Sequence, residues 1–278
     1  MGVFMKRRFG FIKSNWTKNV LALAEMYDSK GEYAKACRCL WDCAIRGKDY
    51  GAVAILGYYY AFGLGCQRNY KRAFQLNRIA ARHGVSEAMR ALANSYFVGE
   101  GVKVNPKKAV KWYFKAAILG DVLSQYDLGI SYDYGQGVKQ NHVEARKWYQ
   151  KAAEQGCAMA QNNLAVCYMT GTGGEKRLTE GIEWYLKAAN QGFALAQYNL
   201  GRCYEDGDGV VQSTKTAVEW FLKAAERGHA KAQCVLAQCY ESGNNVVQSI
   251  EDAIKWYRLA ANQGDEESME ALERIMTR

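Results

Sequence analysis

The residues that most often perform chemistry are few in this chain, and they form no recognised catalytic motif. The three histidines, His83, His142 and His229, lie far apart in the sequence. The chain has no HExxH, GxSxG, phosphate-loop or CxxC motif, which are patterns used by zinc hydrolases, serine hydrolases, nucleotide-binding proteins and redox proteins. The histidines therefore indicate neither a metal centre nor a proton relay.

The nine cysteines are the second group with chemical potential. Cys37, Cys39 and Cys43 are metal ligands by type, but their spacing lies within a helical pattern. A second set recurs every 36 residues at Cys167, Cys203 and Cys239. An odd count without paired spacing gives little support for disulfides. We interpret these thiols as reduced packing residues, which favours a cytoplasmic location.

Acidic residues also fail to form a catalytic pair. Asp133, Glu205 and Glu241 occupy related positions in different segments of the sequence, and none has an evident partner for general acid–base work. We therefore predict that the protein is not an enzyme, with no catalytic residue, no cofactor and no metal ion.

The elements that carry these residues repeat with a fixed period. A tryptophan followed by a Lys-Ala-Ala or similar run returns every 36 residues, at Trp112, Trp148, Trp184, Trp220 and Trp256. A period of this size is typical of a solenoid, in which helical pairs stack and each buries its apolar face against its neighbours. The sequence predicts an all-α fold, a right-handed α-solenoid of antiparallel helix pairs, with the tryptophans buried.

The period also divides the chain. We expect a basic leader of uncertain order at 1–15, a first helical pair at 16–47, six repeats of 36 residues at 51–264 and a charged capping helix at 265–278. Residues 16–278 are expected to form one solenoid of seven helical pairs plus the cap. Preferred N-cap residues precede most of the second helices, whereas Arg177 breaks the series; the caps are Asn69, Asn105, Asn141, Ser213 and Ser249.

The repeated residues resemble those of the Sel-1-like repeat family, a branch of the tetratricopeptide superfamily. The match is clearest from Ala196 to Gly201, through Gly207, Gly209 and Trp220, to Gly228. The first pair, 16–47, resembles the shorter tetratricopeptide unit. The resemblance implies adaptor or scaffold proteins that hold other proteins, in eukaryotic complex assembly and degradation and in bacterial signalling or host interaction. A cysteine-rich bacterial branch linked to penicillin binding has paired cysteines that this chain lacks.

In the superfamily geometry, the first helix of each pair lines a concave surface. The outward positions of these helices vary between repeats, as expected of a surface that recognises a partner protein or peptide. The partner-binding residues predicted on this basis are Tyr58, Arg90, Asn94, Tyr126, Ile130, Asp133, Asn162, Tyr198, Arg202, Glu205 and Gln238. Tyrosine and arginine are frequent energetic anchors at interfaces. The alternative is that these positions are solvated and therefore free to vary.

A glutamine series follows the same period. Its members are Gln125, Gln161, Gln197 and Gln233, with Met89 in the equivalent place. These amides have two interpretations: they contact the backbone of a ligand, or they pack near the helix starts as part of the repeat consensus. We expect the packing role.

Charge is divided unevenly along the chain. Residues 1–120 contain 21 lysines and arginines against 7 acids, whereas residues 121–278 contain 16 against 21. A basic N-terminal half favours an acidic partner, an anionic membrane or nucleic acid; a solvated basic face is the alternative. The outward rows lack the regular base-reading code of nucleic-acid repeat proteins, which argues against nucleic acid.

The sequence thus predicts a non-catalytic scaffold or adaptor that binds a protein or peptide. The alternatives are an electrostatic tether to an anionic surface through the basic half, and a bacterial host-interaction factor of the same repeat family. No apolar run is long enough for a transmembrane segment. The basic N-terminus leaves translocation or organelle targeting as an alternative to the cytoplasm.

Overall fold

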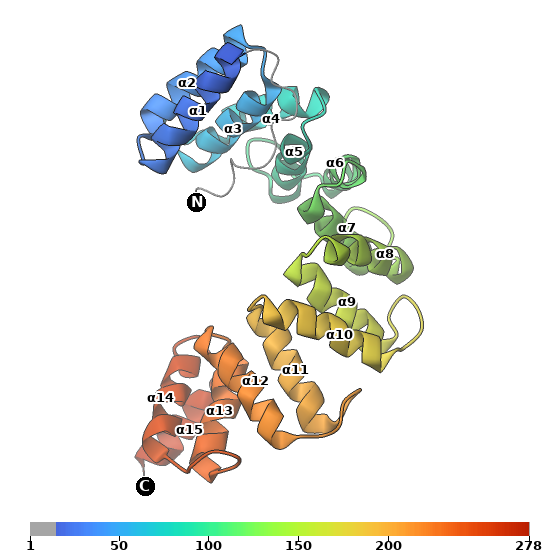
Figure 1. Cartoon of the computed structure of the whole chain (residues 1–278), viewed down its shortest axis with the longest axis vertical. Coiled ribbons are helices and arrows are strands. Elements are labelled where there is room, and N and C mark those ends of the chain that lie inside the picture. The colour runs from blue at the N-terminus through green and yellow to red at the C-terminus, as the bar shows by residue number, and fades with distance from the viewer. Residues whose placement is uncertain (1–14, 278) are drawn as a thin grey trace. The chain divides into compact units, whose positions relative to one another are not determined.

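The computed structural model describes residues 15–277, with side chains from residue 18 onward, and divides the chain into two compact units, Met1–Asn141 and His142–Arg278 (Figure 1). Over the described residues the structure consists of fifteen α-helices and no strand. The predicted leader at 1–15 lies outside this range, except that Asn15 begins the first helix.

The first unit contains seven helices. They are α1 (Asn15–Ser29), α2 (Tyr33–Arg46), α3 (Tyr50–Phe62), α4 (Tyr70–Arg82), α5 (Ser86–Val98), α6 (Pro106–Ile118) and α7 (Val122–Tyr134). The helices of a pair pack together, α1 on α2, α3 on α4 and α5 on α6, and each second helix also packs on the first helix that follows it. The unit is therefore a stack in which every helix contacts its neighbours in sequence.

The second unit continues the same pattern. Its helices are α8 (His142–Glu154), α9 (Ala158–Thr170), α10 (Leu178–Asn190), α11 (Ala194–Asp206), α12 (Thr214–Glu226), α13 (Ala230–Ser242), α14 (Ile250–Ala261) and α15 (Glu266–Met276). Each packs on the next, and α15 covers α14 at the C-terminal end. The predicted all-α fold of packed helix pairs is confirmed. That 16–278 is one continuous solenoid stays a prediction.

Helix ends explain the recurring pair of glycines. Gly99 ends α5 in the left-handed region, with φ of 94°, and its amide donates to the carbonyl of Ser95. The second glycine of each turn is needed for space as well, because a Cβ on Gly101 would lie 2.2 Å from the carbonyl oxygen of Tyr70. Asn245, with φ of 59°, takes this second position in the last repeat, as its tolerance of left-handed backbone allows.

N-caps begin the second helices as the sequence predicts. The side chains of Asn69 and Asn105 accept hydrogen bonds from the amides of Arg72 and Lys108, which satisfies donors that have no partner within the helix. Ser213 and Ser249 cap α12 and α14 in the same way. Arg177 has the extended backbone of an N-cap but makes no side-chain capping bond.

The core differs from the prediction in one respect. The leucine of each first helix is fully buried, from Leu56 to Leu236. Of the tryptophans predicted to be buried, however, only Trp148 is, at 6% exposed; Trp112, Trp184, Trp220 and Trp256 are half-buried. The aromatic residue that follows each tryptophan lies deeper, with exposed fractions of 6% or less; these residues are Tyr113, Tyr149, Tyr185, Phe221 and Tyr257.

The physical reason for the correction is the turn of the helix. Successive side chains point about 100° apart, so where the following aromatic residue faces the interior, the tryptophan lies at the edge of the buried face, often beneath a lysine three residues later. The Lys187 ammonium lies 3.7 Å from the centre of the Trp184 ring, and Lys223 lies 4.0 Å from that of Trp220. This cation–π contact covers the outer face of the ring while the charge stays in water. The tryptophan therefore lines the rim of the core, and its neighbour fills the interior.

The cysteines and glutamines have structural roles. Cys167, Cys203 and Cys239 are buried, as the packing interpretation predicts. Burial raises the pKa of the Cys203 thiol to about 11. Each glutamine of the series donates from Nε2 to the carbonyl of an alanine in the preceding helix, Gln125 to Ala117 at 3.1 Å for example. The series thus closes helix C-termini, as expected for packing.

Within the described residues, no helix is both long enough and apolar enough to cross a lipid bilayer.

Candidate partner-binding surface

The outward side chains of the first helices, which we call the first-helix face, differ in exposure from row to row. In the first unit Tyr58 is 41% exposed and its ring packs against Phe62, with 4.4 Å between ring centres. Asn94 is exposed as well, and its Oδ1 accepts a hydrogen bond from the Tyr113 hydroxyl at 2.6 Å. Tyr113 comes from the second helix of the same pair, so packing and surface residues are connected here.

Arg90, one helical turn before Asn94 on α5, belongs to a half-buried cluster of charged residues. The Arg90 guanidinium pairs with Asp121, with 3.2 Å between Nε and Oδ1. Asp121 also caps α7 by accepting from the Ser124 amide. Burial raises the pKa of the neighbouring Asp127 to about 6, Arg90 lowers it and Asp121 raises it further. Arg90 is therefore held by α7 rather than projecting freely.

The remaining predicted residues of the first unit lie on α7. Tyr126, Ile130 and Asp133 are each half-buried. They present part of each side chain to solvent, so the structure brings a mixed aromatic, aliphatic and acidic row to this helix.

Asn162 in the second unit corrects the prediction. It was expected to point outward, but it is only 2% exposed. Its Oδ1 accepts a hydrogen bond from the Asn199 amide at 3.0 Å, and its own amide donates to Asn163. The Asn162 side chain lies between α9 and α11, where it finds the hydrogen-bond partners that a buried amide requires. Asn162 therefore joins two repeats and is unavailable to a ligand.

Tyr198 and Arg202 on α11 show the two extremes of the face. Tyr198 is half-buried, with its ring stacked on His229 at 4.7 Å and tilted against Phe221 at 5.8 Å. Arg202 is exposed and pairs with Glu205 at 2.9 Å and with Asp206 at 3.2 Å. Arg202 and Glu205 are thus close together at the surface, whereas Tyr198 is largely a packing residue.

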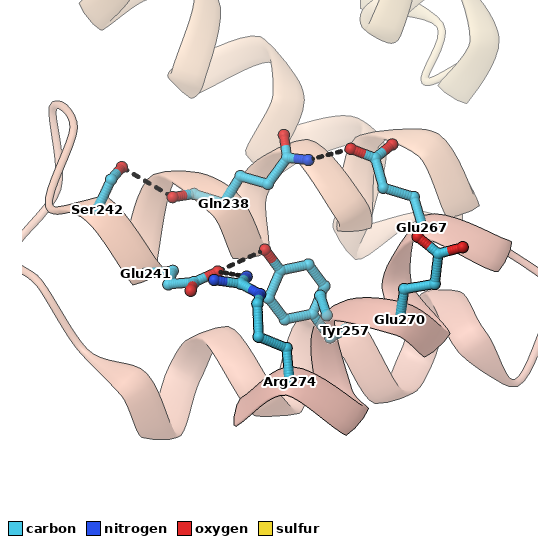
Figure 2. A pocket seen from close by; sticks show the side chains of 8 residues that line it. Gln238, Glu241, Ser242, Tyr257, Glu267, Glu270 and Arg274 are labelled. Carbon is cyan, nitrogen blue, oxygen red and sulfur yellow. Dashed lines mark hydrogen bonds and ion pairs between the residues drawn. The ribbon is translucent and has the colours of Figure 1, made fainter. Parts of the chain in front are cut away.

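A cleft of about 530 Å³ ends the first-helix face, between α13, α14 and α15 (Figure 2). Glu241 lies on one side of it, and its Oε2 accepts from the Tyr257 hydroxyl at 2.9 Å and from the Arg274 guanidinium at 2.8 Å. On the other side Gln238 donates to Glu267. Figure 2 shows Glu270 beside Glu267, on the same helix.

The charge of this cleft is negative. Three carboxylates, those of Glu241, Glu267 and Glu270, face one guanidinium, that of Arg274. The hydrogen bond and the charge of Glu241 raise the pKa of Arg274. Burial, with the hydrogen bond to Glu241, raises the pKa of Tyr257, so this hydroxyl stays a donor. The cleft therefore offers acceptor oxygens to a cationic side chain, held in place by the Tyr257–Glu241–Arg274 contacts.

Sequence reasoning found part of this cleft. Gln238 is one of the predicted partner-binding residues, and Glu241 occupies the position equivalent to Asp133 and Glu205, but Tyr257, Glu267 and Arg274 were not predicted. Tyr257 follows a tryptophan that is the more prominent aromatic residue of the repeat, so the sequence pattern does not single it out. Glu267 and Arg274 could be predicted, since the capping helix α15 occupies the position that the first helix of a further repeat would have.

Comparison with known proteins agrees with this architecture. The model of the Sel1 repeat matches six consecutive segments, residues 52–85, 86–121, 122–157, 158–193, 194–229 and 230–265. The search of curated proteins found no match.

Two crystal structures are similar over most of the chain. One is a protective antigen of uropathogenic Escherichia coli strains, with 32% identity over 95% of this chain and a TM-score of 0.79. This chain spans 57% of that antigen. The other is a Sel1 repeat protein from Oxalobacter formigenes, with 31% identity, 87% of this chain and 96% of that chain covered, and a TM-score of 0.79. An immunity protein of Pseudomonas aeruginosa, with 22% identity and a TM-score of 0.52, shares the fold.

Proposed function

Because the chain belongs to the Sel1 repeat family, whose members are generally protein-interaction scaffolds, we propose that it is a non-catalytic adaptor that holds a partner protein or peptide on its first-helix face. The observation that supports this most is the contrast between positions. Leucine and alanine recur at the packing positions with full burial, whereas the outward positions change from Tyr58 to Asn94, Ile130 and Arg202.

We further propose that the cleft of the second unit receives a lysine or arginine side chain of the partner. Its excess of carboxylates suits a cation, and a cation placed between Glu267 and Glu270 replaces the repulsion between two like charges by attraction. Arg202 and Glu205 lie on the neighbouring first helix, α11, and supply polar contacts to the flanking residues of the partner. Asn162, being buried, is left out of this surface.

The cytoplasmic location is a prediction from cysteine usage. The relative from E. coli is described as a protective antigen, and a role of the present chain in contact with a host stays an alternative prediction.

The test is capture of partners by the full chain from a lysate of the source cells, quantified by mass spectrometry. The cleft variant is Glu267→Gln/Glu270→Gln, which keeps side-chain size on the exposed face of α15. The control is Glu219→Gln/Glu226→Gln, which makes the same change of charge on the exposed face of α12. We expect the cleft variant to lose one or more specific partners that the control retains, and to keep the wild-type circular dichroism spectrum.

If both variants retain the partners, or if only the α12 variant loses them, the cleft is not a binding site for these partners. A further variant, Tyr58→Ala/Arg202→Ala, changes two exposed residues elsewhere on the first-helix face. If all three variants capture the same partners in the same amounts as the wild type, the first-helix face is not the binding surface.

A further inference from the structure

The second helices α4 and α6 of the first unit carry positive charge alone. Each contains four lysines or arginines and no acid, whereas α8, α10, α12 and α14 each contain two acids. The eight cations are Lys71, Arg72, Arg78, Arg82, Lys107, Lys108, Lys111 and Lys115. Across residues 51–120 the sequence holds only two acids, Glu87 and Glu100, and neither lies on these helices.

All eight cations are exposed. None of them takes part in the ion pairs described for the first unit, which join Glu32 to Lys35, Asp42 to Arg46 and Arg90 to Asp121. Three of the eight lie over aromatic rings: Arg72 over Trp41 at 5.3 Å, Lys108 over Tyr96 at 5.4 Å and Lys115 over Trp112 at 4.4 Å. These contacts fix the side-chain stems and leave the charges outside, so the positive field of the two helices is not neutralised locally.

Apolar side chains stand among these lysines at the C-terminal end of α6. Ile118 is 61% exposed and Leu119 is 57% exposed. At the equivalent positions of the next two repeats the chain has polar residues, which are Glu154 and Asn190 for Ile118 and Gln155 and Gln191 for Leu119. The fold therefore does not require an exposed aliphatic pair here. We call the eight cations together with Ile118 and Leu119 the α4–α6 face.

We propose that the α4–α6 face docks on the surface of an anionic lipid bilayer. Lysines and arginines are attracted by the negative potential of acidic headgroups, and exposed aliphatic side chains enter the region between headgroups and acyl chains. Both properties occur on one helix, α6, where Lys111 and Lys115 precede Ile118 by seven and three residues and therefore share its face.

The composition of the face favours lipid over the other anionic partners. Nucleic acid is bound by cations together with aromatic or polar groups that stack on or read the bases, and Ile118 and Leu119 do neither. Protein interfaces are depleted in lysine and enriched in tyrosine, tryptophan and arginine, whereas five of the eight cations of this face, including all four on α6, are lysines. A lysine stem can extend along an apolar layer while its ammonium reaches the phosphates.

The experiment measures binding of the full chain to vesicles by co-sedimentation. The vesicles consist of phosphatidylcholine alone or with about one third phosphatidylserine, at low and at physiological ionic strength. The charge variant is Lys107→Thr/Lys111→Glu, whose new residues occur naturally at the equivalent positions Thr179 and Glu183. The apolar variant is Ile118→Asn/Leu119→Gln, also taken from the later repeats. The control, Lys147→Glu/Lys215→Thr, changes the charge by the same amount on α8 and α12.

We expect the wild type to bind the acidic vesicles and not the neutral ones, with weaker binding at higher salt. The charge variant should bind about 100-fold more weakly, since each charge near an acidic surface contributes roughly a fivefold factor. The apolar variant should bind at least about tenfold more weakly, because it removes the two exposed aliphatic side chains that enter the bilayer. The control should bind like the wild type, and all variants should keep its helicity.

Four outcomes overturn the proposal. The first is no binding to acidic vesicles, and the second is equal loss in the α6 variants and the control. The third is binding that disappears when Lys6, Arg7, Arg8 and Lys13 are changed to glutamine but persists in the α6 variants, which would place the contact on the N-terminal residues. If single-stranded RNA or poly-glutamate binds more tightly than the vesicles and the α6 variants abolish that binding, the partner is a different polyanion and the lipid proposal is wrong. Partner capture by the first-helix face is independent of all these results.

Discussion

Truncation of two adjacent aromatic residues, Trp184 and Tyr185, should separate the rim of the core from its interior. The tryptophan is the more prominent residue in the sequence pattern, yet it is half-buried, whereas Tyr185 is 5% exposed. We predict that Tyr185→Ala destabilises the protein more than Trp184→Ala does. The prediction reverses the order that side-chain size alone suggests.

The magnitudes follow from burial. Replacing a buried large aromatic residue by alanine removes its transfer free energy and leaves a cavity, which together cost about 3–5 kcal/mol. Trp184 keeps part of its ring in water and covers another part with Lys187, 3.7 Å from the ring centre. Its truncation should cost about 1–3 kcal/mol, of which the cation–π contact accounts for roughly 0.5–1 kcal/mol. Tyr185→Phe is the matched control, because Phe221 occupies the same position one repeat later; it should be almost neutral.

The assay is urea denaturation followed by circular dichroism, with hydrogen exchange to locate the opening. A stack of repeats loses structure locally when one interface is weakened, so Tyr185→Ala should increase exchange in α9, α10 and α11 before α13 and α14. The reasoning is refuted if Trp184→Ala costs as much as Tyr185→Ala, or if Tyr185→Phe is as damaging as the alanine variant.

Two further predictions concern a buried carboxyl and a missing cap. Burial raises the pKa of Asp127 to about 6 from its ordinary 3.8. Between these two pH values the folded state holds a proton that the unfolded state releases. The contribution of this group to stability is therefore full below about pH 4 and is lost as the pH rises through 6. Asp127→Asn should therefore stabilise the protein by about 1–2 kcal/mol at pH 7, with the gain shrinking toward pH 4, in urea titrations at both pH values; an equal effect at the two would contradict the cause. Arg177→Asn should raise stability by about 0.5–1 kcal/mol by supplying the N-cap of α10, since the exposed ion pairs of Arg177 with Glu175 and Glu180 contribute little; an unchanged melting temperature would count against it.

The repeat pattern predicted the fold because the same interactions recur at a fixed spacing. Each Leu, Ala and Gly position appears several times in the sequence, so its packing or turn role could be inferred from the set rather than from one residue. The tryptophan position shows where this reasoning stops. Trp184 and Tyr185 are both large, aromatic and periodic, and only the burial of each ring in the structure shows which of them faces water.

The first-helix face was less predictable, for a related reason. An outward position in an ideal helix becomes a buried one when a side chain finds a partner on the next repeat, as Asn162 does with Asn199. Each such hydrogen bond depends on two variable residues in different repeats, so the sequence of a single repeat does not predict it. Arg90 is another case, because its ion pair with Asp121 draws it toward α7.

The hydroxyl groups of the second helices connect the packing positions with the proposed recognition surface. Tyr113 donates to Asn94, and Tyr257 donates to Glu241, in each case across the pair to its first helix. Phe221 has no hydroxyl, and in that repeat Glu205 pairs with Arg202 on its own helix instead. In these two repeats a hydroxyl at a buried position thus holds an outward side chain in place. Variation of the face therefore arises partly from the interior, which explains how repeats with nearly identical cores can present different polar groups to a partner.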